Sequence, residues 1–188
     1  WEVDQPIQNY APKFDEIESH RGFYALSHMV VKSLGNLALN LKIYGQENIP
    51  IDGRGIIACN HRHWADPPLL GASVETRHLS ALAKKEIFEN KVGKWLMDQY
   101  QAVEIDREDF SLESARQIKS RLDQDRLIML FPEGTRQTTE NIGELKAGAD
   151  LFARLGKAPT IPSAIAGIDN VSRRAMGVKL PRARIIFG

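Results

Sequence analysis

One histidine and one aspartate lie five positions apart in an unusual loop, and together they have the chemistry of a base and the group that orients it. His61 and Asp66 belong to the stretch Asn60-His61-Arg62-His63-Trp64-Ala65-Asp66-Pro67-Pro68, which directly follows an apolar run. A carboxylate that accepts the N–H of one imidazole nitrogen fixes the tautomer and leaves the other nitrogen able to take a proton. Such a pair can activate an alcohol for attack on an acyl carbon. Because an aspartate before a proline is also typical of a helix N-cap, the spacing alone leaves a purely structural role for Asp66 open.

Two other chemistries for this loop fit less well. His61 and His63 alternate as in some zinc hydrolases, but Ala65 stands where that pattern has an aspartate, and Pro67 follows Asp66 in place of a histidine. Cys59, the one cysteine of the chain, lies within the apolar run, where cysteine usually behaves as a small hydrophobe. We therefore expect neither a metal site nor a thiol nucleophile.

A second loop with functional groups, Pro132-Glu133-Gly134-Thr135-Arg136, follows the apolar run 127–131. Gly134 permits a tight turn whose N–H groups can face an anion, and the planar fork of Arg136 can bind phosphate in two places. Glu133 could orient a sugar or glycerol hydroxyl. Lys84 and Arg107 each follow a further strand-like run, so three cations would meet at one sheet edge, which suits a phosphomonoester. The alternative is a plain surface turn with solvated basic residues.

The elements that must position these loops alternate between strands and helices. We expect strands at 55–59, 78–83, 102–106, 127–131, 160–166 and 183–187, and helices at 86–100, 111–122 and 146–155. This alternation predicts an α/β fold with a mostly parallel central sheet flanked by helices on both faces. Since ligands bind outside the carboxyl ends of the strands in such sheets, we expect the two loops to share one cleft.

An amphipathic helical segment is expected before the sheet. The stretch from Phe23 to Leu41 is interrupted by Lys32, Asn36 and Asn40, so it is too polar to span a membrane. Its apolar residues recur at helical spacing and would either pack on the core or rest on a membrane surface. They include Leu26, Met29, Val30, Leu34, Leu37 and Leu41. We divide the chain into a helical segment, residues 1–42, and an α/β domain, residues 43–188, whose last strand-like run breaks off as if the C-terminus were truncated.

Composition narrows the classes of function. The 188 residues carry 25 basic and 24 acidic side chains, a net charge of +1 that gives no reason to expect a nucleic-acid partner. Hydrophobic residues make up 43% and charged residues 26%, as in a single globular domain. Residues 1–20 hold five acids and one base, whereas residues 151–188 hold seven bases and one acid. The basic end would suit anionic lipid headgroups or a phosphorylated substrate, or be a solvated face.

Four blocks, in this order, resemble those of the glycerolipid acyltransferase family, whose best-known members are the 1-acyl-sn-glycerol-3-phosphate acyltransferases. Residues 60–66 resemble the family's Asn-His-x-x-x-x-Asp block, and residues 131–136, Phe-Pro-Glu-Gly-Thr-Arg, match its third block without a mismatch. Residues 102–107 resemble the second block, which ends in Asp-Arg, and residues 161–165 the fourth, which is usually Val-Pro-Val. Residues 83–86 match a recurrent Ala-Lys-x-Glu stretch, and the resemblance extends from about residue 43 to 187.

The resemblance implies a reaction and a role for each matching residue. A fatty acyl group would pass from a thioester of coenzyme A or acyl carrier protein to the free hydroxyl of lysophosphatidic acid, giving phosphatidic acid without a metal or cofactor. His61 would take the hydroxyl proton and Asp66 would orient it. The acceptor's phosphate and glycerol would contact Lys84, Arg107, Glu133, Gly134, Thr135 and Arg136, and Pro162 would line the acyl-donor side.

The family also places a membrane-associating helical element before the first block, where Phe23 to Leu41 stands. This resemblance implies a peripheral protein on the cytoplasmic face of a membrane, with the membrane surface and a lysophospholipid as partners. Glu104 and Ser163 depart from the usual pattern, and both can alter the acceptor or acyl pocket. The alternatives are an acyltransferase for a different lyso-lipid or glycolipid acceptor and an inactive lipid-binding relative.

Overall fold

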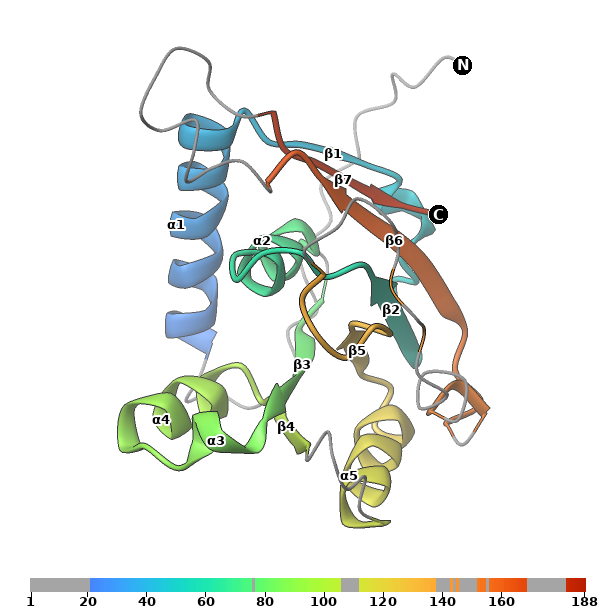
Figure 1. The fold of residues 1–188 in the computed structure, drawn as a ribbon. Helices are drawn as coiled ribbons and strands as arrows, with labels where there is room; N and C mark the ends of the chain where they lie inside the picture. The colour runs from blue at the N-terminus through green and yellow to red at the C-terminus, as the bar shows by residue number, and fades with distance from the viewer. Residues whose placement is uncertain are drawn as a thin grey trace.

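A computed structural model describes residues 21–75, 77–105, 112–137, 143, 145, 152–154, 156–168 and 182–188. Seven strands in these ranges form one sheet in the order β1-β7-β6-β2-β5-β3-β4 (Figure 1). The strands are β1 (Lys42–Tyr44), β2 (Gly55–Cys59), β3 (Leu79–Lys84), β4 (Val103–Ile105), β5 (Leu127–Leu130), β6 (Thr160–Ala166) and β7 (Arg184–Phe187). The helices are α1 (Arg21–Leu39), α2 (Asp66–Ser73), α3 (Lys85–Phe88), α4 (Lys91–Gln99) and α5 (Leu112–Asp123), with a short 3₁₀ turn at Gln46–Asn48.

The middle of the sheet is parallel and buried on both faces. β2 pairs with β5 on one side and β6 on the other, so that Ile57 lies opposite both Met129 and Ile161. β3 continues the parallel arrangement from β5 to β4, whereas β7 runs antiparallel to β6. Strands buried on both faces are expected to be continuously apolar, as β2 and β5 are. The mostly parallel α/β fold expected from the sequence is therefore confirmed.

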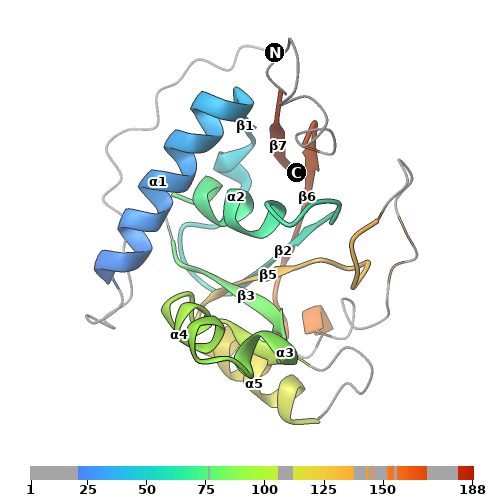
Figure 2. The same cartoon turned by 60° about the vertical axis from the view of Figure 1, so that its left-hand side comes forward.

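Helices cover both faces of the sheet. α1 and α2 lie on one face, over a core cluster that includes Leu39, Leu69, Ile57 and Met129. α5 lies on the other face, where Ile118 and Leu122 pack on Ile56, Val103 and Ile128. Figure 2 shows the central strands between these two layers. Since all the central strands end at the same edge, the loops that follow β2 and β5 are brought to one side of the molecule.

One predicted element needs correction and one element was missed. The helix expected at 86–100 is two helices, because Asn90 lies between them and its side chain accepts a hydrogen bond from the N–H of Gly93 (2.7 Å), which starts α4 anew. The three-residue strand β1 was not predicted, since so short a run has no readable periodicity. Glu104, the unusual charge in a predicted strand, is exposed because β4 is an edge strand. Most of the helix expected at 146–155 lies outside the described residues.

The apolar stripe of α1 faces outward. Leu26, Met29, Leu34 and Leu37 are 55%, 61%, 57% and 78% exposed, Val30 is exposed too, and of the stripe predicted from the sequence Leu41 alone, beyond the helix end, is buried. Core packing of that stripe was thus the wrong alternative. α1 instead buries Tyr24 and Leu39 and approaches α2 at Gly35, where a Cβ would lie 3.1 Å from both Leu41 and Leu69.

Among the helices in the described ranges, none is long and apolar enough to cross a membrane.

Candidate active site

A buried histidine–aspartate pair lies where β2 ends. The Nδ1 of His61 is 3.0 Å from Oδ2 of Asp66, and the two residues are 8% and 1% exposed. The same Oδ2 accepts hydrogen bonds from the backbone N–H groups of Arg62 (2.6 Å) and His63 (2.7 Å). Asp66 is the first residue of α2, after the N-cap position Ala65, and its carboxylate turns back to the loop. The cap-only alternative is therefore wrong, and the carboxylate orients both the imidazole and the loop that carries it.

This arrangement determines which imidazole nitrogen can act as a base. A carboxylate is an acceptor only, so the proton of neutral His61 lies on Nδ1, where it is donated to Asp66. Nε2 then carries the lone pair and can accept a proton from a substrate hydroxyl. The pair has the chemistry expected of a general base with its orienting carboxylate.

The loop after β5 meets the loop after β2. The ring of Phe131 stacks on that of His61, with centroids 4.3 Å apart and an interplanar angle of 27°. The N–H of Gln137 donates to the carbonyl of His61 over 2.8 Å, so the segments around residues 61 and 136 adjoin. Gly134 adopts φ of +69° in the intervening turn, and its N–H donates to Phe131 O (3.0 Å). Two loops distant in sequence thus form one site, and Phe131 and Gln137 belong to it although no sequence signal marked them as partners of His61.

Asn60 attaches the start of the loop that carries His61 to the neighbouring strand, β6. Its Oδ1 accepts from Ile165 N (2.8 Å) and its Nδ2 donates to Ile165 O (3.0 Å). These two bonds replace the backbone ladder where β2 stops and β6 continues. Sequence reasoning noted Asn60 only as part of a block, and the signal for its role is its place directly before the histidine at a strand end.

Glu133 brings a second buried carboxylate to the site. It is 3% exposed, and its Oε2 is buried without a hydrogen-bond partner in the described structure. Burial raises the pKa of the Cys59 thiol to about 12, and the charges of Asp66 and Glu133 add to this, so the thiol stays protonated. Within the described ranges, no three His, Cys, Asp or Glu side chains gather in a way that could hold a metal ion. The unpaired Oε2 of Glu133 is available to accept a hydrogen bond from a hydroxyl group.

Of the four residues expected to contact phosphate, three lie within the described structure. Arg136 and Thr135 are exposed on the turn that follows Glu133. Lys84 ends β3 and forms an ion pair with Glu86, and the register that pairs Ala81 with Met129 brings it level with the start of this turn. Arg107 lies outside the described residues. The structure thus puts Lys84, Thr135 and Arg136 at the same sheet edge as His61.

Pro162 lies on β6, opposite Ala58, and is exposed. Ile161, directly before it, and Ile165, three residues after it, belong to the core cluster beneath α1 and α2. Because successive strand residues face opposite sides, Pro162 points to the other face of the sheet. Its role on the acyl-donor side stays a prediction.

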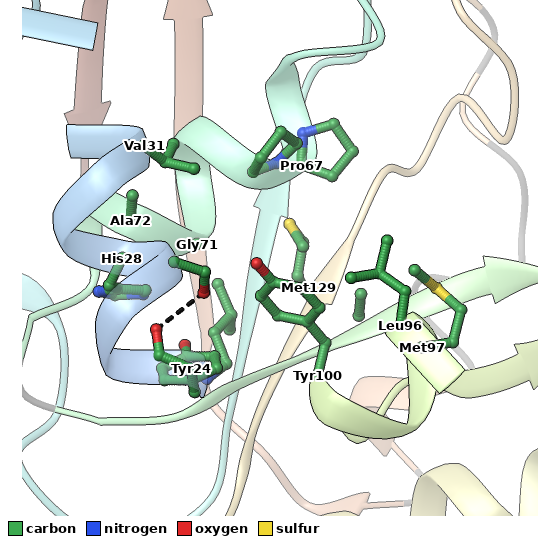
Figure 3. Close-up of a pocket in the computed structure, with 14 residues that line it drawn as sticks. Tyr24, His28, Val31, Pro67, Gly71, Ala72, Leu96, Met97, Tyr100 and Met129 are labelled. Atoms are coloured by element: carbon green, nitrogen blue, oxygen red, sulfur yellow. Dashed lines mark hydrogen bonds between the residues drawn. The ribbon is translucent and has the colours of Figure 1, made fainter. Parts of the chain in front are cut away.

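An apolar cavity of about 220 Å³ lies between α1, α2, α4 and the sheet. Its walls come from α1, α2, β3, α4 and β5, and Pro67 and Pro68, which directly follow Asp66, form one side (Figure 3). Figure 3 shows Tyr24 across the cavity from Pro67, with Leu96 and Met97 contributed by α4 and Tyr100 by the position directly after that helix. The hydroxyl of Tyr24 accepts a hydrogen bond from Leu79 N (3.2 Å), and burial raises its pKa to about 12. Such a cavity suits a hydrocarbon chain and was not found from the sequence, because its walls come from five separate elements.

Comparison with known proteins gives the family. The family profile described as Acyltransferase matches residues 40–166, which include both loops. The 1-acyl-sn-glycerol-3-phosphate acyltransferase of Bacillus subtilis is 35% identical over 145 residues, which cover 77% of this chain and 71% of the relative. The protein of the same name from Streptococcus pneumoniae is 30% identical over 154 residues, 80% of this chain and 57% of the relative.

A solved structure has the same fold. The crystal structure of the 1-acyl-sn-glycerophosphate (LPA) acyltransferase PlsC from Thermotoga maritima superimposes with a TM-score of 0.74, covering 93% of this chain and 70% of that one. At 19% identity this likeness concerns the fold alone. Together with the profile and the curated relatives, these findings identify the chain as a member of the acyltransferase family and as an enzyme.

Proposed function

We propose that the enzyme transfers a fatty acyl group from a thioester to the free hydroxyl of lysophosphatidic acid, giving phosphatidic acid. The observation that carries this proposal is the buried His61–Asp66 pair, whose Asp66 directly precedes Pro67 in the wall of an apolar cavity. The names of the relatives from Bacillus subtilis and Streptococcus pneumoniae support the choice of acceptor.

In the reaction, Nε2 of His61 takes the hydroxyl proton of the acceptor as its oxygen attacks the thioester carbonyl. The tetrahedral oxyanion that forms then collapses, the carbon–sulfur bond breaks, and the imidazolium gives its proton to the leaving thiolate. The proton taken from the acceptor thus leaves with the thiol, and neither a covalent acyl-enzyme nor a metal takes part. Asp66 stabilises the imidazolium through the Nδ1 bond and keeps the ring in place.

The acceptor's polar part would bind between the two loops. The unpartnered Oε2 of Glu133 can accept a hydrogen bond from the glycerol hydroxyl and align it with His61. The exposed guanidinium of Arg136 would hold the phosphate as a bidentate partner, with Lys84 and, by resemblance, Arg107 beside it. The turn at Gly134 and Thr135 sets the distance between the carboxylate of Glu133, which would bind the hydroxyl, and the guanidinium of Arg136, which would bind the phosphate.

The apolar cavity would hold an acyl chain. Each buried methylene contributes about 0.8 kcal/mol, so a chain inside the cavity is a large part of the binding energy. Because Pro67 lines the cavity and Asp66 precedes it, a chain in the cavity brings its carboxyl end close to His61. The donor thioester is that of coenzyme A or of acyl carrier protein.

The outward face of α1 would rest on the membrane surface, at its cytoplasmic side. Its large exposed side chains, Leu26, Met29, Val30, Leu34 and Leu37, form a stripe that water solvates poorly. α1 also lines the cavity through Val31 and Tyr24, so the surface that meets lipid adjoins the place where a chain is bound.

A thiol-release assay with acyl-CoA or acyl carrier protein as donor tests this function. Lysophosphatidic acid should be consumed and its unphosphorylated analogue, a monoacylglycerol, should react far more slowly. Arg136→Ala should lower kcat/KM for the phosphorylated acceptor about 10- to 100-fold, since a charged hydrogen bond contributes about 1.5–3 kcal/mol, and should affect the monoacylglycerol little. Arg182→Ala, an exposed arginine elsewhere, is the matched control. Equal losses for both acceptors would exclude the phosphate role, and no thiol release with any lysophospholipid would exclude the function.

A further inference from the structure

A second group of cations lies at the opposite edge of the sheet from the catalytic pair, where the strands begin. His78 and Arg126 directly precede Leu79 and Leu127, which pair with each other in β3 and β5. Neighbouring strands lie about 4.8 Å apart, so these two residues are side by side. The N–H of Arg126 donates to the carbonyl of Arg121 (3.2 Å), at the end of α5. We call the three arginines Arg77, Arg121 and Arg126, together with the neutral His78 beside them, the amino-edge cluster.

Arg126 is the unusual member of the cluster. It is 8% exposed, and its Nε and Nη1 are buried with no hydrogen-bond partner among the residues that the structure describes. Arg77 differs, because its guanidinium donates to the backbone carbonyls of Pro50 (3.3 Å) and Asp125. Buried guanidinium N–H groups are costly when left unpaired, so a partner that accepts hydrogen bonds is expected at Arg126.

The cluster is also short of negative charge. The neighbouring carboxylates are engaged elsewhere, Asp123 with Lys119 and Arg54 and Asp125 with Arg54 (3.8 Å). In the part of the chain that the structure describes, no carboxylate forms an ion pair with Arg121 or Arg126. Burial and the charge of Arg126 lower the pKa of Arg121, and burial, Arg126 and His28 lower the pKa of His78 to about 4. Arg121 and Arg126 are thus close enough for the charge of Arg126 to disfavour the charge of Arg121.

We propose that the amino-edge cluster binds a phosphate-type oxyanion, held by the unpartnered nitrogens of Arg126 and by Arg121 beside it. A buried cation cluster is stable when an anion supplies both charge and hydrogen-bond acceptors, and a tetrahedral oxyanion supplies several acceptors at once. This site is separate from the acceptor's phosphate site, because Arg136 lies at the carboxyl edge of the same sheet. The inference does not rest on the proposed reaction.

The amino-edge cluster lies next to the contact between α1 and the sheet. The His78 ring packs against that of Tyr24, with centroids 4.1 Å apart, and Tyr24 both belongs to α1 and lines the cavity. An oxyanion held by Arg126 would therefore lie beside the contact through which the first turn of α1 joins the sheet.

Thermal unfolding in a titration with inorganic phosphate, at constant ionic strength, tests the proposal. The Tm of the wild-type enzyme should rise by about 3–6 °C at a phosphate concentration ten times Kd. Arg136→Ala, which removes the carboxyl-edge guanidinium, should keep this rise, and Arg126→Gln should lose it. If Arg126→Gln does not fold, the half-buried Arg121→Gln takes its place. No rise in the wild type, an equal rise in the amino-edge variant, or a rise lost in Arg136→Ala would each overturn the proposal.

Two sources of the oxyanion are distinguished with vesicles. Co-sedimentation with vesicles of phosphatidylcholine containing phosphatidic acid is compared between the wild type and the amino-edge variant, that is, Arg126→Gln or its substitute Arg121→Gln. A headgroup ligand predicts weaker co-sedimentation of the variant, whereas free phosphate as the ligand predicts equal co-sedimentation together with the lost Tm response. Each pattern supports the site and assigns its ligand.

Discussion

Asp66→Asn is the sharpest test of the catalytic assignment, because it removes a charge and leaves the shape. Oδ2 of Asp66 accepts three hydrogen bonds, one from His61 and two from the backbone N–H groups of Arg62 and His63. Hydrogen bonds to a charged group contribute about 1.5–3 kcal/mol and neutral ones about 0.5–1.5 kcal/mol. The variant should therefore lose about 2–3 kcal/mol of stability, or about 5–10 °C in Tm for a chain of this size.

The loss of activity should be larger than the loss of stability explains. In the variant the amide oxygen takes the place of Oδ2 and keeps all three N–H donors, including Nδ1–H of His61. A neutral oxygen holds the ring less firmly and no longer stabilises the imidazolium that forms when Nε2 takes the proton. Because a hydrogen bond to a charged group contributes about 1.5–3 kcal/mol, we expect kcat to fall about 10- to 100-fold while the protein remains folded.

The measurement is a thiol-release rate at saturating substrates, together with Tm for the same preparations. Asp98→Asn, at an exposed aspartate paired with Lys94 on α4, is the matched control and should change neither quantity appreciably. A folded Asp66→Asn enzyme with nearly full kcat would refute the reasoning, because the orientation of His61 would then not depend on the carboxylate.

Four further results are expected. His61→Ala should lower kcat about 10²–10⁴-fold with folding intact, which the same rate assay and a circular dichroism spectrum check. Ala72→Leu, which extends a buried side chain into the cavity, should shift the preferred acyl donor to shorter chains in a series of acyl-CoA substrates, and an unchanged profile would place the chain elsewhere. Replacing Leu34 and Leu37 by Asp should weaken vesicle binding without lowering Tm, because both side chains are exposed. Burial lowers the pKa of His78 to about 4 and holds it neutral in the folded protein, so between about pH 6.5 and pH 4 the unfolded chain binds more protons than the folded one. As the pH is lowered through this range, the free energy of unfolding should therefore decrease by up to about 3 kcal/mol. In denaturant titrations in phosphate-free buffer, His78→Phe should remove this part of the fall, and an unchanged pH slope would contradict the assignment.

The parallel fold could be predicted because its central strands are short apolar runs separated by helical periodicity. β2 and β6 begin and end where the sequence indicated, and β5 differs by one residue. The meeting of the two loops followed from the rule that parallel strands end at one edge, and the stacking of Phe131 on His61 is its physical result. What the spacing of His61 and Asp66 could not decide was whether the carboxylate caps α2 or faces the imidazole. That choice depends on the backbone path of residues 62 and 63, whose N–H groups draw the carboxylate back to the loop.

The orientation of α1 could not be predicted from its periodicity. Periodicity locates a stripe of large aliphatic residues but does not say which side of the helix meets the protein. The buried side of α1 includes Tyr24 and Gly35, with His28 partly buried, and such residues contribute little to a hydrophobic pattern. They fit there because Gly35 allows close approach to Leu69 and because Tyr24 has a backbone donor for its hydroxyl. The same limitation hid the cavity, since its walls combine α1 with four other elements.

α2 joins the catalytic pair to the cavity and, through α1, to the surface proposed to meet lipid. Asp66 is its first residue and Pro67 and Pro68 come next, so the residue that orients His61 and the wall of the cavity belong to one helical turn. α1 packs on α2 at Gly35 while its other side exposes Leu34 and Leu37. A Cβ at position 35 would lie 3.1 Å from side-chain atoms of both Leu41 and Leu69, so these side chains would have to shift by a few tenths of an ångström. The glycine at this position therefore lets α1 approach the helix that begins with the residue orienting His61.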